Sequence, residues 1–408
     1  MKHDGTWLYA NPKHIEEVKR IWDIEECQAA NTPGIKNKKD SNEDLEELSD
    51  EEAGMFRRSV GILLYIAHDR PDCQFSIGEC SKYIKTPTVG ALKKLKRLIR
   101  YLHGTANYGI WFGAKGDLED IVCWTDADWA GDTETRYSTS GIIITVGGSM
   151  VFSSSRRQHA RALSSGESEY YAATTGAADL LHLIEVMKFF GVDARGRLQT
   201  DSSACIGMAS RKGVGRVRHL ETRALWLQDV IDSERISIKK VPGEENLGDI
   251  GTKNLEYERH AYLTDAIGMH NMKESKVQRI GSSGGTGASS STGNGGQHAA
   301  VLSALAVLFQ ALGVKGQRTG FHLDDLQLAT MNGEKGDAGG GSALAILWLC
   351  LAVFVLGMVF ENWLARRYYQ MTAADKRTAT TQSMTTYTWW WTENPRFVLQ
   401  KNDGGLHV

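Results

Sequence analysis

The segment WTDADWAGDTETRYSTSG, residues 124–141, decides the fold. It continues an apolar run, Ile121–Thr125, which is typical of a buried strand, and Asp126 and Asp128 follow where that strand ends. Clusters of Asp, Gly and Thr commonly form turns at strand ends, because their side chains hydrogen-bond nearby backbone groups. The alternative is that a strand-end aspartate is a metal ligand. That alternative requires partner carboxylates elsewhere in the chain.

Strands and helices alternate downstream of this segment. Two apolar runs, 141–146 and 150–153, flank Gly147-Gly148 and predict a hairpin. Helices are predicted over 164–190, 202–210 and 219–232, and strands over 197–200 and 235–241. Strands followed by alternating helices and strands predict an α/β layer with a mixed sheet.

Further acidic residues stand at the ends of these predicted elements. Glu169 lies near the start of the long helix, Asp201 at the end of a second strand, and Asp249 on a short segment near the sheet. Carboxylates packed together repel one another unless cations lie between them, and ligands that are all oxygen select Mg²⁺ or Mn²⁺. Together with Asp126, these residues predict a site for two divalent ions ~3.5–4 Å apart, an arrangement that hydrolyses phosphodiesters.

The chain from Trp124 to Lys253 resembles the ribonuclease H domain of copia-type retrotransposon polyproteins. The resemblance rests on TDADWAGD, TSG at 139–141, SSGESEY, TDSSA, RHLETR and NLGDIGTK. It implies a ribonuclease H-like mixed sheet flanked by helices and hydrolysis of the RNA strand of an RNA–DNA hybrid. It also implies that the catalytic, metal-binding carboxylates are Asp126, Glu169, Asp201 and Asp249. Asp128 is then a turn or supporting residue.

Upstream segments extend the resemblance. FRRSVGILLYIAHDRPDCQFSIGECSKYIKTP and LKRLIRYLHGT are similar to the end of the copia-type reverse transcriptase. We therefore expect residues 1–115 to be a mainly helical thumb and connection remnant, and residues 116–260 to be the nuclease domain. The sequence contains no Tyr-x-Asp-Asp polymerase motif, so we do not expect DNA synthesis by this chain alone. The rest of a reverse transcriptase is an expected partner.

The segment around the fourth carboxylate departs from the family. VPGEENLGD lacks the mobile histidine that bacterial and retroviral relatives carry before the last aspartate. Gly248 and Gly251 flank Asp249 where the family more often has better helix formers. A glycine inside a helix costs roughly 0.5–1 kcal/mol, so we expect Asp249 to be loosely held. An active enzyme and a catalytically inactive fragment that only binds nucleic acid, or is tethered to a membrane, are both consistent with this pattern.

Two basic segments are candidates for phosphate contacts. One is the polar face of the predicted helix ALKKLKRLIRYLHGT, with Lys93, Lys96, Arg97 and Arg100. The other is RKGVGRVRH, with Arg211, Lys212, Arg216, Arg218 and His219. Solvated charge that contacts no ligand is the alternative for both.

Composition excludes little, because the 408 residues carry a formal charge of only −2. The six cysteines lack CxxC spacing, which favours reduced thiols, and the first residues have no apolar signal-peptide core. A Gly/Ser-rich linker region is predicted over 281–342 and a C-terminal tail over 361–408. Between them, residues 343–360 are eighteen uncharged residues that predict a single transmembrane helix. This predicts membrane localisation, with the cytoplasm or nucleus as the alternative.

Overall fold

The computed structural model describes residues 5–24, 26–36, 42–113, 117–189, 191–213, 215, 222–273, 386–391 and 397–402. The chain divides into two compact units, Met1–Thr330 and Met331–Val408. In the second unit, strands β9 (Thr386–Trp391) and β10 (Phe397–Asn402) form an antiparallel pair. All other described elements belong to the first unit.

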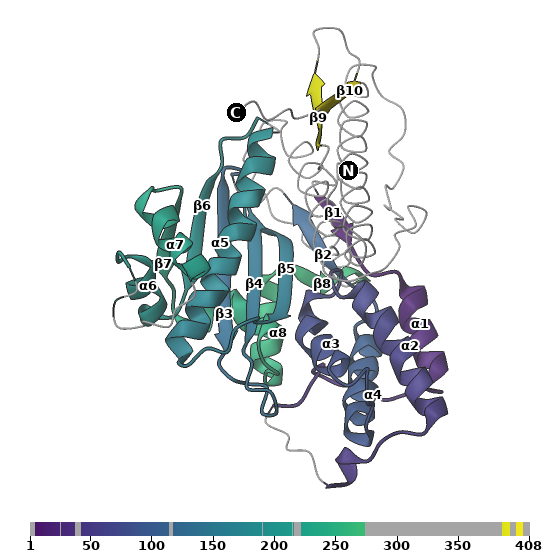
Figure 1. Cartoon of the computed structure of the whole chain (residues 1–408). Coiled ribbons are helices and arrows are strands. Elements are labelled where there is room, and N and C mark those ends of the chain that lie inside the picture. The colour runs from purple at the N-terminus through teal and green to yellow at the C-terminus, as the bar shows by residue number, and fades with distance from the viewer. Residues whose placement is uncertain are drawn as a thin grey trace, which may run out of the picture. The chain divides into compact units, whose positions relative to one another are not determined.

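A five-stranded sheet forms the centre of the segment that the sequence predicts to be the nuclease domain, residues 116–260, which is called the nuclease-like part below (Figure 1). The strands are β3 (Asp120–Asp128), β4 (Thr139–Val146), β5 (Ser149–Arg157), β6 (Arg195–Thr200) and β7 (Ile236–Lys240). Their spatial order is β5-β4-β3-β6-β7. The first three strands are antiparallel neighbours, whereas β6 and β7 run parallel to β3. The predicted mixed sheet is therefore confirmed.

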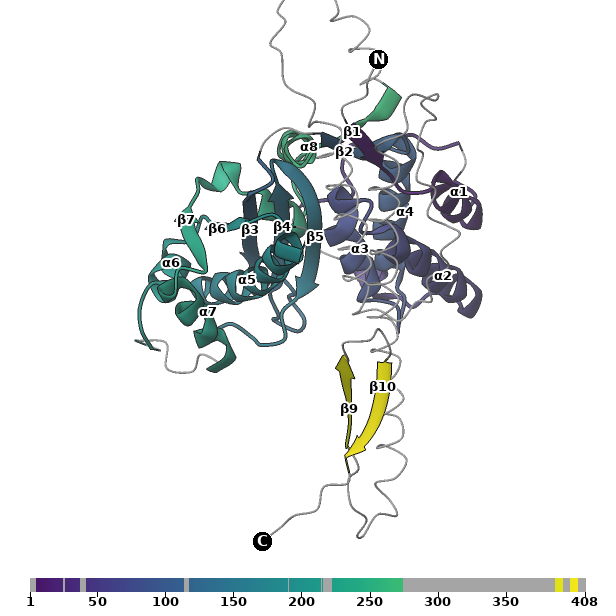
Figure 2. The same cartoon turned by 90° about the horizontal axis from the view of Figure 1, so that it is seen from above.

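Helix α5 (Ser165–Phe189) covers one face of this sheet, which Figure 2 shows nearly edge-on. Gly176 allows this close packing, because a Cβ there would lie 2.6 Å from Thr125 Cγ2 and 3.0 Å from Cys123 Sγ. Two further helices, α6 (Ser203–Ala209) and α7 (Thr222–Asp232), complete the α/β layer.

The opposite face of β3 and β4 carries a short 3₁₀ helix, η4 (Leu247–Gly251). A Cβ on Gly248 would lie 2.7 Å from the backbone nitrogen of Asp126, and one on Gly251 would lie 3.0 Å from Gly141 Cα. The expectation that these glycines loosen Asp249 is therefore wrong. They are the residues that let this segment pack directly on the sheet backbone.

The upstream part of the first unit is mainly helical. Its helices are α1 (Pro12–Ile21), α2 (Asp50–Ile66), α3 (Gln74–Ser81) and α4 (Val89–Gly104), with 3₁₀ helices η1 (Asn42–Leu45) and η2 (Pro71–Cys73). A third 3₁₀ helix, η3 (Gly243–Glu245), lies outside this part and precedes η4 in the chain. Their apolar faces form one core that includes Phe56, Leu63, Leu95 and Leu98.

Contacts join this helical part to the end of the nuclease-like part. Strand β2 (Tyr108–Gly113) pairs with both β1 (Gly5–Leu8) and β8 (Met269–Asn271). From α8 (Tyr257–Ala266), the ring of buried His260 lies 3.0 Å from the carbonyl oxygen of Asp72. The two parts on either side of the predicted boundary near residue 115 are thus joined by a three-stranded sheet and by contacts of α8.

The prediction of a single-pass membrane protein is corrected. Among the residues that the structure describes, no helix is both long and apolar enough to cross a bilayer. Helix α5 has the length, at 25 residues, but it carries five charged side chains. Residues 343–360, the linker region 281–342 and most of the tail lie outside the described residues. We assign no membrane partner or membrane localisation.

Candidate active site

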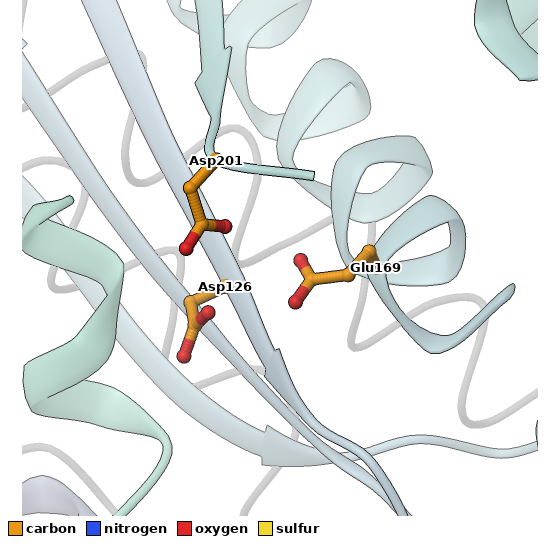
Figure 3. A group of neighbouring side chains, drawn as sticks. All are labelled: Asp126, Glu169 and Asp201. Atoms are coloured by element: carbon orange, nitrogen blue, oxygen red, sulfur yellow. The ribbon is translucent and has the colours of Figure 1, made fainter. Parts of the chain in front are cut away.

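Three carboxylates from distant parts of the sequence meet at one edge of the sheet (Figure 3). Asp126 lies on β3, Glu169 near the start of α5, and Asp201 directly after β6. Each offers one oxygen, and these oxygens all lie within 4.8 Å of one another. The structure thus brings together three of the four carboxylates that the sequence predicts.

The strand register explains why the two aspartates meet. Strands β3 and β6 are parallel neighbours, with Trp124 opposite Gln199. Asp126 and Asp201 each come two residues after this pair. They therefore lie at the same level along two strands that are ~4.8 Å apart. The first turns of α5 then bring Glu169 to the same edge.

Burial and mutual repulsion raise the pKa of two of these acids, Glu169 and Asp126. Burial, together with the nearby charges of Asp126 and Asp201, raises the pKa of Glu169 to about 9. Burial also raises the pKa of Asp126 to about 6, although the ammonium of Lys253 acts in the opposite direction. Moreover, Glu169 Oε2 is inaccessible to solvent and has no hydrogen-bond partner in the described structure. Such a cluster is stabilised by a cation.

Asp249 stands apart from the three, because two cations already hold it. Lys253 Nζ lies 2.5 Å from Asp249 Oδ1, and Arg259 Nη2 lies 2.9 Å from Asp249 Oδ2. The same lysine lies 3.7 Å from Asp126 Oδ2. Asp249 is therefore beside the site but already paired.

Hydrogen bonds fix the segment of Asp249 against β3. Asn246 Nδ2 donates to the carbonyl oxygen of Thr125 at 3.0 Å. Thr252 Oγ1 donates to Asp126 Oδ2 at 2.5 Å, which orients that carboxylate. The fourth predicted residue is thus held firmly by its neighbours.

Two other acids, Glu167 and Asp128, lie near the site. Glu167 Oε2 accepts from the backbone nitrogen of Leu163 at 2.8 Å, and its Oε1 accepts from the Tyr171 hydroxyl at 3.0 Å. Glu167 therefore caps the start of α5. Partial burial raises the pKa of Asp128, which lies beyond Asp126 on the same strand.

The basic face of α4 contacts the preceding segment of the chain. Lys93 Nζ donates to Asp44 at 2.7 Å, Arg97 to Thr32 Oγ1 at 2.8 Å, and Arg100 to the Gln28 carbonyl at 2.7 Å. The ammonium of Lys96 lies 5.5 Å from the centre of the Trp22 ring. These side chains are thus engaged within the protein.

The second basic segment is described only in part. Lys212 is exposed and forms an ion pair with Asp232 at 3.0 Å, and Arg211 precedes it after α6. Arg216, Arg218 and His219 lie outside the described residues.

A cationic stack at the β5 end was missed by sequence reasoning. The guanidiniums of Arg157 and Arg161 lie 4.8 and 4.9 Å from the centre of the Tyr137 ring. Arg157 pairs with Thr139, which in turn pairs with Asp128, so the stack begins two strands away from the carboxylate strand. The sequence feature that could have indicated this stack is the basic run SSSRRQHAR, residues 153–161.

The chain is similar in sequence to parts of retroelement polyproteins. No family model matches. The chain is 27% identical over 271 residues to the retrovirus-related Pol polyprotein from transposon TNT 1-94 of Nicotiana tabacum, covering 65% of this chain and 20% of that one. It is 37% identical over 126 residues to the secreted RxLR effector protein 161 of Plasmopara viticola, covering 31% of this chain and 88% of the effector.

Among solved structures, the N-terminal RNase H domain of a Mycobacterium tuberculosis protein matches at 14% identity and a TM-score of 0.26. That match covers 36% of this chain and 97% of the other.

A mixed sheet of this order, with acids at the ends of β3 and β6 and on α5, defines a ribonuclease H-like domain. The homologues of this chain are retrovirus-related Pol polyproteins of plant transposons, which agrees with the predicted resemblance to copia-type polyproteins. The chain spans about a fifth or less of the length of these polyproteins.

Proposed function

We propose that the first unit is an endoribonuclease that hydrolyses the RNA strand of RNA–DNA hybrids with divalent metal ions. The observation that supports this proposal is the meeting of Asp126, Glu169 and Asp201, whose oxygens lie within 4.8 Å. Three acids from separate elements at this spacing are costly to fold, because like charges repel in a site of low dielectric.

The donor set fits Mg²⁺ or Mn²⁺, because all three ligands are carboxylate oxygens and one of them, Glu169 Oε2, is buried without a partner. Asp126, Glu169 and Asp201 would hold the first ion. A second ion would add Asp249 and share Asp126. When bound, such ions activate water for attack and stabilise the leaving oxygen of a phosphodiester.

The protein's own side chains prepare this chemistry. The hydroxyl of Thr252 orients Asp126, and Asn246 fixes the loop that follows β7 against β3. The stack of Arg157, Tyr137 and Arg161 supplies positive charge at the end of β5, two strands from β3, where phosphates of a bound strand would be attracted. The Arg211–His219 segment and the α4 face remain predicted nucleic-acid contacts. Discrimination of RNA would rest on groove shape and on 2′-hydroxyl contacts.

The test is cleavage by the full chain of a labelled hybrid, beside duplex DNA, with Mg²⁺ present. We expect the hybrid alone to be cut, and Asp126→Asn to slow cutting at least ~100-fold, because removal of a group that stabilises charge in the transition state has effects of this order. The matched control is Asp117→Asn, since Asp117 is exposed and precedes β3 on the far side from the site.

Equal rates for the wild-type protein and Asp126→Asn would reject this assignment of the ligand. Hybrid binding by the wild-type protein without any cleavage would favour the second candidate, a nucleic-acid-binding fold that has lost activity. The pairing of Asp249 with two internal cations is the observation that favours that candidate.

A further inference from the structure

Lys253 places a cation inside the acidic cluster. Its ammonium bridges two carboxylates, at 2.5 Å from Asp249 Oδ1 and 3.7 Å from Asp126 Oδ2. Because burial is only partial, with 47% of the side chain exposed, the ammonium can leave this position towards solvent. Arg259 adds a second positive charge on the far oxygen of Asp249.

The backbone on both sides of Lys253 is fixed, so this placement is built into the fold. Before it, the Thr252 hydroxyl donates to Asp126 Oδ2 and also lies 3.2 Å from the carbonyl oxygen of Asp249. After it, Asn254 accepts from Ser76 Oγ at 3.1 Å and donates to the Ile35 carbonyl at 3.4 Å. Segments of the helical part thus hold the loop that presents the lysine.

The two edges of the acidic cluster consequently differ in charge. Asp126, Glu169 and Asp201 approach one another without a cation among the described side chains that bridges all three. The edge between Asp126 and Asp249 already has a counter-ion, the ammonium of Lys253. A divalent ion at that edge would meet the ammonium at close range, and like charges a few ångströms apart repel strongly in a partly buried site.

We propose that Lys253 is the resident counter-ion of the cluster and sets the order of metal binding. The first ion enters between Asp126, Glu169 and Asp201. A second ion binds between Asp126 and Asp249 only after the ammonium has moved away. This inference rests on the proposed function for the identity of the metal site, but it concerns binding and not catalysis, and Lys253 acts as a positioning residue.

The experiment is calorimetric titration of the full chain with Mn²⁺, without nucleic acid. We expect one tight and one weak site in the wild-type protein. Lys253→Met should tighten the weak site at least ~10-fold and the tight site by less, because the ammonium lies 2.5 Å from Asp249 at the second edge but 3.7 Å from Asp126, which both edges share. Lys253→Gln is a second variant that tests the same loss of charge, and Lys253→Arg should behave as the wild-type protein.

Lys188→Met is the matched control. It removes the same charge from the last turn of α5, and Glu169 near the helix start is 19 residues, or about 28 Å, away. Its isotherm should equal that of the wild-type protein.

Unchanged Mn²⁺ binding in both Lys253→Met and Lys253→Gln would overturn the inference, as would equal tightening in Lys188→Met. If the Lys253 variants bound Mn²⁺ as the wild-type protein does and still cleaved the hybrid, the proposed function would stand without this role for Lys253. Failure of every variant to bind Mn²⁺ would overturn both.

Discussion

Asp179 is a single residue on α5 whose burial has a measurable cost. Its Oδ2 atom is buried without a hydrogen-bond partner in the described structure. Burial raises the pKa of Asp179 to about 6, although Arg156 acts in the opposite direction. An acid whose pKa is higher in the folded than in the unfolded protein binds more protons when folded. Its contribution to stability is therefore greatest below about pH 4 and is lost as the pH rises through about 6.

We expect Asp179→Asn to raise the free energy of unfolding by about 3 kcal/mol at pH 8 and to leave it nearly unchanged at pH 4. Urea denaturation at the two pH values measures this difference. Asp193→Asn, in the loop before β6, is the control. A gain of equal size at both pH values would show that packing, and not ionisation, is responsible.

Individual residues also show how far the sequence predicts the site. Asp126 and Asp201 are predictable, because Asp126 follows an apolar run, Asp201 follows a second predicted strand, and parallel strands end at the same edge. Glu169 is predictable from its place near a helix start. Lys253 and Arg259 are not, since their approach to Asp249 depends on the docking of α8 and on contacts with distant loops.

At the scale of elements, η4 shows why the glycine pattern was misinterpreted. A glycine is expected to lower the stability of a segment when that segment is treated as an isolated helix. Here the segment is a 3₁₀ helix that lies on the backbone of β3 and β4. Glycine is required at these positions because a Cβ would clash with that backbone, and helix propensity is not the determining factor. The strands and helices of the sheet, by contrast, were predicted closely, because their periodicity is a local property of the chain.

Gly248→Ala should destabilise the protein by roughly 1–3 kcal/mol, because the added methyl group would overlap the β3 backbone at Asp126. The measurement is the free energy of unfolding in urea. The control is Gly61→Ala in α2, where a Cβ meets nothing within 4 Å and should stabilise by roughly 0.5–1 kcal/mol. Equal effects of the two substitutions would contradict the close approach.

At the scale of the whole first unit, a buried polar network joins the helical and nuclease-like parts. Arg70 donates to both oxygens of Asp72, at 3.0 and 2.8 Å, and Tyr101 donates to Asp72 at 2.8 Å. His260 reaches the Asp72 backbone from α8, and its ring meets that of Tyr101 edge-on. The sequence did not reveal this network, because its members are far apart along the chain.

We expect Asp72→Asn to cost roughly 3–5 kcal/mol, because it leaves the Arg70 guanidinium buried without a counter-charge. Both parts should lose stability in one transition, which circular dichroism and tryptophan fluorescence would report together. Two separate transitions, with only the helical part affected, would show that the parts fold independently.

The comparison variant is Glu17→Gln, which breaks the exposed ion pair with Arg58. Since exposed pairs contribute about 0–1 kcal/mol, this change should have little effect.

The pairing of β2 with β8 has a consequence for synthesis on the ribosome. Tyr108 lies opposite Asn271, so the ribosome must add the whole intervening chain before that strand finds its last neighbour. At ~5–20 residues per second, this takes roughly ten to thirty seconds. During that interval one side of β2 has no partner strand, and a premature stop codon ahead of residue 269 would leave it so permanently.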